Sequence, residues 1–554
     1  MKVLLWMVLL AAQAYGQVYP YRWVYFTRNL SSDSHVEEFR GVARVASEHG
    51  LNGVMLSASF DNIGRQSAAY WRRLGEVRRI AEEYSLEIIP LFYSAGYAGG
   101  ILSHNRNLAE GIPVKNALFV VSGNEARLEP DPPVEVVNGG FEEYTNHVPR
   151  GYRFNDNPGE VTSIDTEVFH GGTASMRFEN FAAHPARNAR VMQEIPVQPN
   201  RCYRVTAWVK TENFAPVSSL RVQVLALDGR ALAPWAPNVP ATTDWRKLVF
   251  GFNSGNYDKI RLYAGAWAAQ SGKFWFDDLS IEEAGLINVL RRPGTPVRVE
   301  SEQTGTVYEE GADYQYIADP QLNFRFDHDG PAIRLIPLGR ISEGEKLRVS
   351  YYHGMSVNDG QVTACMSEPA VYDILASSLK LIHELLAPKK YMLSIDEIRA
   401  GGTDESCKQR GMTMGEILGD YVTRGVQMIR EVNPEAEVLA WSDMLDPNHN
   451  AHGNYYLVEG DYTGSWDHVP RDLIIVTWYY ARRIESLRFF SGLGFRTLAG
   501  AYYDGDTLDN PKGWLAALKD TPGASGIMYT TWQNKYGLLA GFGDLVSKPP
   551  DPLP

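Results

Sequence analysis

The sequence predicts an α/β protein, a (β/α)8 barrel of the TIM type with a β-sandwich of jelly-roll type and a small β subdomain inserted after strand three. Three observations lead to this fold. Short apolar runs alternate with amphipathic helical patterns near both ends of the chain. Between residues 93 and 370 no long helical periodicity occurs, and short alternating runs separated by turn residues dominate;. The strand candidates outside that interval add up to eight.

The first part of the barrel covers residues 17–128 and holds strands one to three. A 554-residue chain is longer than one hydrophobic core usually serves, so further domains are expected;. The strands are apolar runs, and the helices between them carry apolar residues at helical spacing, with Ser34 as a candidate N-cap. The expected strands are 22–28, 53–58 and 86–92, and the expected helices are 34–49 and 68–84.

The insertion begins after a proline-rich linker at residues 129–133;. The pattern of residues 134–285 predicts the sandwich, because many short strands follow one another at regular spacing. Residues 286–352 predict the small β subdomain. The expected sandwich strands are 161–167, 175–179, 202–210, 220–227, 245–252, 260–267 and 274–283.

The second part of the barrel covers residues 353–554. A helix at 371–386 precedes strand four, which starts at Lys390 and ends in the adjacent carboxylates Asp396 and Glu397. A long helix is expected at 415–432;. Strands five to eight are expected at 437–443, 473–478, 496–502 and 526–532.

Composition and charge favour a neutral ligand. The net charge of −13 argues against a nucleic-acid partner or an anionic membrane surface;. Aromatic residues make up 12% of the chain, a share that suits stacking on uncharged sugar rings and equally suits β-rich cores;. The sequence shows no metal cluster, phosphate loop or Ser-His-Asp elbow, so no metal and no cofactor are expected.

The N-terminal segment and the cysteines indicate the cellular compartment in which the protein works. Residues 1–16 have the pattern of a signal peptide, with Lys2, an apolar run and small residues at the cleavage site, which predicts a secreted or periplasmic protein;. No later apolar run is long enough for a membrane span. The spacing of the three cysteines matches no zinc motif. A disulfide between Cys365 and Cys407 is compatible with export, and Cys202 is expected to be a buried thiol;.

The predicted strands end on residues suited to holding a sugar. In a β/α barrel such ends meet at one face, where active sites form. An isolated Asp-Glu pair is more often a turn or a helix cap, and one tryptophan at a strand end is ordinary core. Several such residues at the same face favour a pyranose pocket instead. They are Arg28, Asp396, Glu397, Trp441, Asp443, Trp478, Tyr502, Asp504 and Trp532.

The spacing of the acids limits the chemistry. Retaining and inverting glycosidases need two carboxylates on opposite sides of the scissile bond, about 5 Å or more apart, and neighbours in sequence rarely provide them. Strand seven ends in Tyr502-Tyr503-Asp504 and offers no glutamate nucleophile. Substrate-assisted hydrolysis, in which the 2-acetamido group of the sugar is the nucleophile, needs no opposed carboxylate.

The barrel resembles the family 20 glycoside hydrolases, the β-N-acetylhexosaminidases, over residues 21–95 and 370–540. The resemblance implies that Asp396 orients the acetamido group and that Glu397 is the general acid/base. It further implies that Arg28 and Asp504 bind hydroxyls and that Tyr502 binds the acetamido oxygen, and that three tryptophans enclose the sugar, namely Trp441, Trp478 and Trp532.

The chain departs from that family in three places. Ser394 stands where the family usually has glycine, Tyr93-Ser94-Ala95-Gly96-Tyr97 replaces an Asp-x-Pro-Gly-His motif, and the usual N-terminal α+β domain is absent. The inserted residues 134–285 resemble jelly-roll carbohydrate-binding modules through Val137-Asn138-Gly139-Gly140-Phe141-Glu142 and the segment 273–281. Binding through Trp235 and Trp267, or a scaffolding role, are both consistent with this resemblance.

The sequence therefore predicts a secreted, exo-acting β-N-acetylhexosaminidase-like hydrolase that acts on an oligosaccharide, polysaccharide or glycoconjugate. A glycosidase of different specificity, in which Glu397 works with Asp443 or Asp504, is an alternative. A non-catalytic carbohydrate-binding protein is another.

Overall fold

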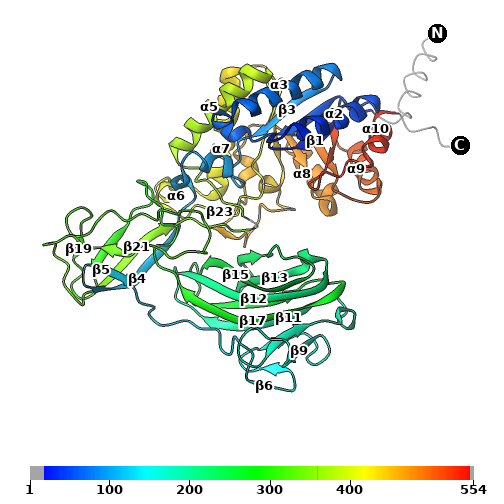
Figure 1. Ribbon diagram of the computed structural model, residues 1–554. Helices are drawn as coiled ribbons and strands as arrows, with labels where there is room; N and C mark the ends of the chain where they lie inside the picture. The colour runs from blue at the N-terminus through cyan, green and yellow to red at the C-terminus, as the bar shows by residue number, and fades with distance from the viewer. Residues whose placement is uncertain (1–17, 359, 549–554) are drawn as a thin grey trace, which may run out of the picture.

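In the computed structural model, which describes residues 18–358 and 360–548, eight parallel strands close into a barrel (Figure 1). The fold class predicted from the sequence is confirmed. The predicted signal peptide, residues 1–16, lies outside the described residues. In barrel order the strands are β1 (Tyr21–Thr27), β2 (Gly53–Ser57), β3 (Glu87–Phe92), β22 (Lys390–Leu393), β24 (Glu437–Trp441), β26 (Ile474–Thr477), β27 (Arg496–Tyr502) and β28 (Ala524–Thr530).

Side chains along each barrel strand alternate between two apolar cores, as the two-residue period of a strand requires. On β1, Trp23 and Tyr25 point into the barrel, and Val24 and Phe26 belong to the core beneath the helices. The interior also holds Trp441 of β24. Near-continuous apolar runs are typical of strands that are buried on both faces.

The barrel is surrounded by amphipathic helices with clear start signals. Ser67 caps α3 by accepting the Tyr70 N–H at 3.2 Å, and Thr413 and Glu416 form a capping box on α7;. The N-cap of the first long helix is Ser32, two residues before the predicted cap at Ser34. The outer helices are α2 (Asp33–Glu48), α3 (Ala68–Glu83), α5 (Pro369–Leu386), α7 (Met414–Val432), α8 (Arg483–Gly492), α9 (Asp509–Lys519) and α10 (Leu539–Ser547).

The inserted sandwich consists of two antiparallel five-stranded sheets, at the bottom of Figure 1. One sheet contains β15 (Thr243–Asn253), β12 (Cys202–Ala215), β17 (Ser271–Glu283), β10 (Ser175–Phe178) and β9 (Thr162–Asp165). The other contains β14 (Ala231–Trp235), β13 (Leu220–Ala226), β16 (Lys259–Ala266), β11 (Ala189–Pro196) and β8 (Phe154–Asn155).

A third, six-stranded sheet lies at the left of Figure 1 and moves one predicted boundary. Residues 112–128, assigned to the barrel from sequence, form two strands of this sheet, because β4 pairs with β21 from Val120↔Lys346 to Ile112↔His353. The insertion therefore starts before the proline-rich linker. The strands are β19 (Val307–Tyr308), β18 (Arg298–Ser301), β21 (Lys346–His353), β4 (Ile112–Ser122), β5 (Glu125–Leu128) and β20 (Ile333–Arg334).

The insertion contacts the loops at the carboxyl ends of the barrel strands. Strands β23 (Ala400–Gly401) and β25 (Leu457–Val458) pair in parallel between the loops that follow β22 and β24. The sandwich reaches β25 through Arg230, whose Nη1 donates to the Val458 carbonyl at 2.9 Å. None of the helices within residues 18–358 and 360–548 has both the length and the apolar character of a membrane span.

Candidate active site

A pocket of about 790 Å³ opens at the carboxyl ends of the barrel strands. All eight strands, or the residues directly after them, contribute to its lining. This is the face at which β/α barrels place their active sites, since the connecting loops meet there. The lining includes Tyr25, Thr27, Ser57, Asp61, Leu91, Ser94, Tyr97, Ser394, Asp396, Glu397, Trp441, Trp478, Tyr503, Asp504, Trp532 and Gln533.

Aromatic rings form one side of this pocket. The Trp441 ring lies 6.5 Å from Trp478 and 5.8 Å from Trp532, measured between centroids. Tyr25 lies 5.3 Å from Trp532, and Tyr503 lies parallel to Trp478 at 6.1 Å. The three tryptophans named from the sequence are thus brought together in the pocket lining, where Trp441 is almost fully buried and Trp532 is the most exposed of the three.

Asp396 lies beside the aromatic wall in a segment that follows β22. The Ser394 hydroxyl donates to its Oδ1 at 2.8 Å. Burial, together with the neighbouring charge of Glu397, raises the pKa of Asp396 to about 6;. The carboxyl is therefore mainly ionised at pH 7 and becomes neutral in mild acid.

Glu397 is held by contacts from two other loops and from its own segment. Its φ of 48° is in the left-handed region, which turns its side chain relative to Asp396;. Its carboxylate accepts a hydrogen bond from the Tyr97 hydroxyl and pairs with Arg399 at 2.9 Å. Its carbonyl accepts the Gln361 amide at 2.6 Å, so the backbone is fixed as well as the side chain.

Asp443 lies behind the two acids and is absent from the described lining of the pocket. Its Oδ2 accepts the Glu397 backbone N–H at 2.8 Å and the Asn450 amide at 2.9 Å. Burial, with the charge of Asp396 as the next cause, raises the pKa of Asp443 to about 8;. Asp443 thus orients the Glu397 backbone, and its Oδ1 also accepts the Trp478 indole N–H at 3.4 Å.

Three consecutive left-handed residues end β27 and decide which tyrosine faces the pocket. Tyr502, Tyr503 and Asp504 have φ values of 81°, 58° and 59°. Tyr502, which was expected in the pocket, is instead buried, with its ring stacked 4.0 Å from that of Tyr529. Tyr503 lines the pocket in its place.

Asp504 lies in the pocket lining, but its oxygens already have donors. Its Oδ2 accepts the Trp532 N–H at 2.8 Å, and its Oδ1 accepts the Thr531 hydroxyl and, at 3.3 Å, the Gln533 N–H. These contacts fix the segment after β28 that carries Trp532.

Arg28, the other residue expected to bind hydroxyls, lies away from the described lining. It forms an ion pair with Glu38 of α2 at 2.6 Å. An acid one helical turn into the following helix offered it a closer partner than the pocket does. This pairing was not predictable, because no sequence pattern fixes the direction of an arginine side chain at a strand end.

The structure adds functional candidates that the sequence analysis did not name. Tyr25 lies inside the barrel, and Tyr97 occupies the segment where the chain departs from the family motif. Arg399 follows Glu397 by two residues. This spacing indicates that the two residues are near each other, but it does not predict an ion pair. Tyr503 was visible only as the neighbour of Tyr502.

The sandwich tryptophans are half-buried. Trp235 stacks on Phe250 at 5.1 Å, and the Arg190 guanidinium lies 5.6 Å from the Trp267 ring. Each ring therefore keeps part of its surface accessible while one face is covered by the sandwich itself.

Comparison with known proteins identifies one domain. Residues 135–270 match the model of the family described as "Carbohydrate binding domain". No curated protein sequence matches the chain.

Solved structures give distant likenesses. Flavobacterium johnsoniae chitobiase is 7% identical, with 96% of this chain and 48% of that chain covered and a TM-score of 0.36. A rhamnosidase from Novosphingobium sp. PP1Y is 8% identical, with 94% and 56% covered and a TM-score of 0.31. A cyclase from Fischerella sp. TAU is 18% identical over 27% of this chain and 96% of its own, with a TM-score of 0.22. Likenesses of this extent assign no activity.

Proposed function

We propose that this protein is a glycoside hydrolase that removes a terminal β-linked N-acetylhexosamine by substrate-assisted catalysis. Asp396 accepts the acetamido N–H and orients the group, so that the carbonyl oxygen of the same sugar attacks the anomeric carbon. Glu397 protonates the departing glycosidic oxygen. It then takes a proton from the water that opens the cyclic intermediate, which returns the anomeric configuration of the substrate.

The proposal rests on the hydrogen-bond partners of the carboxylates in the pocket. Among the described residues, four carboxylates line it. Asp61 accepts the N–H groups of Tyr93 and Ser94 at 2.7 and 3.2 Å, and Asp504 accepts the donors after β28. These two are engaged in fixing the backbone. Asp396 and Glu397 are left. Their carboxylates contact the side chains of Ser394, Tyr97 and Arg399. The two acids are adjacent in sequence, an arrangement that suits orientation of a nucleophile supplied by the substrate.

The lining also favours an uncharged sugar. The described residues around the pocket include no lysine, arginine or histidine, so a phosphate or carboxylate group of a ligand would meet no cation;. Three tryptophans and three tyrosines contribute aromatic rings to the lining;. The carbohydrate-binding match to residues 135–270 supports a saccharide ligand for the whole chain.

We further propose export, which rests on the sequence pattern of residues 1–16 alone;. Expression of the full chain with fractionation tests this, because cleavage after residue 16 would leave a mature protein that starts at Gln17.

The test of the catalytic proposal is hydrolysis of aryl β-glycosides with and without a 2-acetamido group. Turnover should be confined to N-acetyl substrates, with a product of retained configuration. Asp396→Asn and Glu397→Gln should each lower kcat/KM by about 10²–10⁴-fold. The loss in Glu397→Gln should shrink for aryl leaving groups of low pKa, which need no proton.

Other outcomes would reject the proposal in favour of the alternatives. Turnover of plain glucosides or galactosides that survives in Asp396→Asn would point to Asp504 as the second acid. Saccharide binding without turnover, unchanged in Glu397→Gln, would indicate a non-catalytic binding protein.

A further inference from the structure

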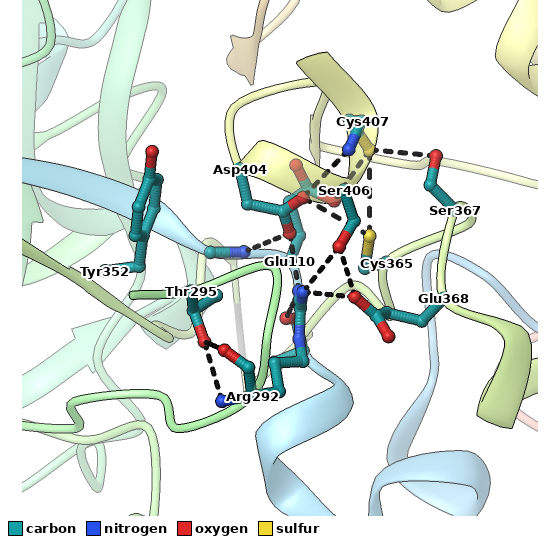
Figure 2. Close-up of polar contacts among 12 residues, drawn as sticks. Glu110, Arg292, Thr295, Tyr352, Cys365, Ser367, Glu368, Asp404, Ser406 and Cys407 are labelled. Atoms are coloured by element: carbon teal, nitrogen blue, oxygen red, sulfur yellow. Dashed lines mark hydrogen bonds and ion pairs between the residues drawn. The ribbon is translucent and has the colours of Figure 1, made fainter. Parts of the chain in front are cut away.

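A buried cluster of two thiols and two carboxylates lies outside the pocket, where the insertion meets the barrel. Figure 2 shows the sulfurs of Cys365 and Cys407 facing each other with Asp404 and Glu110 beside them. All four side chains are at most 3% exposed. One atom from each can be chosen so that the four atoms lie within 4.8 Å of one another. None of the four belongs to the described lining of the active-site pocket.

Three of the six distances between the ligand atoms match the edges of a tetrahedron around one small cation, and the others are at most 4.8 Å. Zinc bonds of about 2.3 Å to sulfur and about 2.0 Å to oxygen imply S···S edges of about 3.8 Å and S···O edges of about 3.5 Å. The two sulfurs lie 3.6 Å apart. Cys365 Sγ lies 3.6 Å from Asp404 Oδ1, and Cys407 Sγ lies 3.7 Å from Glu110 Oε2.

One oxygen of each carboxylate faces the sulfurs, and both carboxylates are held in place by further donors. Asp404 Oδ2 accepts Arg292 Nη2 at 2.5 Å, and its Oδ1 also accepts the Cys407 N–H at 3.1 Å. Glu110 Oε1 accepts the Thr403 N–H at 2.8 Å. Such partners orient metal ligands from outside.

Glu110 has no cationic side-chain partner among the described residues, since the only close guanidinium pairs with Asp404 and Glu368. A carboxylate buried to this extent is normally paired with a cation or coordinated to a metal ion. A thiol is a weak hydrogen-bond donor and a poor substitute for either.

We propose that Glu110, Cys365, Asp404 and Cys407 bind one zinc ion or a similar thiophilic divalent cation in a structural site. Both thiols lose their protons to solvent on binding, and the resulting thiolates and the two carboxylate oxygens supply four protein ligands. A site closed by four protein ligands leaves no position for substrate or water, which is the property of a structural zinc site. The expectation from cysteine spacing missed it because two ligands are carboxylates.

The site would join three segments that the sequence separates. Glu110 precedes β4, where the chain leaves the barrel, and Cys365 precedes α5, where the chain returns. Asp404 and Cys407 belong to α6 (Glu405–Lys408) and its cap, in the loop that follows the acid pair. One ion would fix both ends of the insertion against that loop.

The experiment measures metal and thiols in the full chain, purified from an exporting host without chelators. We expect about one zinc ion per chain, three alkylatable thiols after unfolding with a chelator, and a lower Tm after metal removal that added zinc restores. Replacing zinc with cobalt should give the near-ultraviolet absorption of a thiolate–cobalt bond.

Variants separate the cluster from a general effect of removing a cysteine. Glu110→Gln and Cys407→Ser should lose the bound metal, while Cys202→Ser, which removes a buried free thiol elsewhere, should keep it. The thiol count of the unmodified chain decides the question independently of how Cys407→Ser folds. Metal-free protein with one alkylatable thiol would reveal a Cys365–Cys407 disulfide and overturn the proposal, as would equal metal content in Glu110→Gln.

Discussion

At the scale of single residues, the ionisation of Asp396 sets the acid limb of activity. The proposed mechanism needs the carboxylate form, which accepts the acetamido N–H. Since the pKa of Asp396 is raised to about 6, the carboxylate is present above that value and is lost as pH falls through it;. We expect kcat/KM of the unmodified enzyme to decline about tenfold per unit below pH 6. Asp396→Asn should be weakly active and lack this limb. The pH values 5 and 7 bracket a pKa of about 6. Equal kcat/KM of the unmodified enzyme at these two pH values would contradict this role.

Asp443 gives a second residue-scale test, because it distinguishes an orienting acid from a catalytic base. Its pKa is raised to about 8, so at pH 7 a neutral amide of the same shape should replace it with a loss of less than about tenfold in kcat;. Asp443→Ala should lose more, about 1–3 kcal/mol of stability, since it leaves the Glu397 N–H buried without an acceptor;. Kinetics and thermal unfolding of the two variants check this. Loss of all turnover in Asp443→Asn would instead make it the base.

Which residues gather at the strand ends was predictable, but the direction of each side chain was not. Trp441, Trp478 and Trp532 follow from counting strands, because the carboxyl ends of parallel strands share one face. Tyr502 and Tyr503 exchange places because the chain turns through the left-handed region there, and no local pattern marks that turn.

At the scale of elements, the acid pair lies in an irregular segment that packs tightly on the loop after β3. A Cβ atom added at Gly96 would lie 2.4 Å from the Asp396 carbonyl oxygen and 3.0 Å from that of Glu397. We expect Gly96→Ala to shift this segment and lower kcat by about 10²-fold, because displacement of catalytic groups by about 1 Å has that effect.

The control for that substitution is Gly75→Ala on α3, where an added Cβ meets no atom within 4 Å. It should leave kcat unchanged and raise stability by about 0.5–1 kcal/mol, as alanine does within a helix. Equal activity in Gly96→Ala and Gly75→Ala would show that the acid pair tolerates movement of its loop.

The elements themselves were largely predictable, since the barrel helices and strands have strong periodicity. There are two exceptions. The helices α8, α9 and α10 were not named from the sequence, and β4 with β5 was assigned to the barrel. Their alternating pattern identifies a strand but not its partner, and the partner, β21, lies more than 200 residues later. Pairing over that distance is set by tertiary packing, which local residue patterns do not encode.

At the scale of the whole molecule, the question is whether the sandwich serves the active site or only carries a sugar-binding surface. Its contact with the barrel is specific. Arg230 donates to the carbonyls of Val458 and Tyr456, at 2.9 and 3.3 Å. The Arg399 guanidinium, which pairs with Glu397, lies 5.1 Å from the Tyr456 ring. The sandwich is therefore connected to Glu397 through one loop.

If that connection positions the loop, Arg230→Ala should lower kcat on a small aryl glycoside by about 10-fold. Hydrogen bonds from a charged group are worth about 1.5–3 kcal/mol, and we expect part of the lost free energy to appear as a higher activation barrier. Arg221→Ala, at an exposed arginine of β13, should have no such effect.

Trp235→Ala should leave turnover of the aryl glycoside unchanged and weaken retention on polysaccharide if the sandwich binds sugar. Because the small substrate is too short to occupy both domains, a decrease in kcat for Arg230→Ala reports scaffolding alone. Unchanged kinetics with weakened polysaccharide binding in Trp235→Ala would make the sandwich an independent binding module.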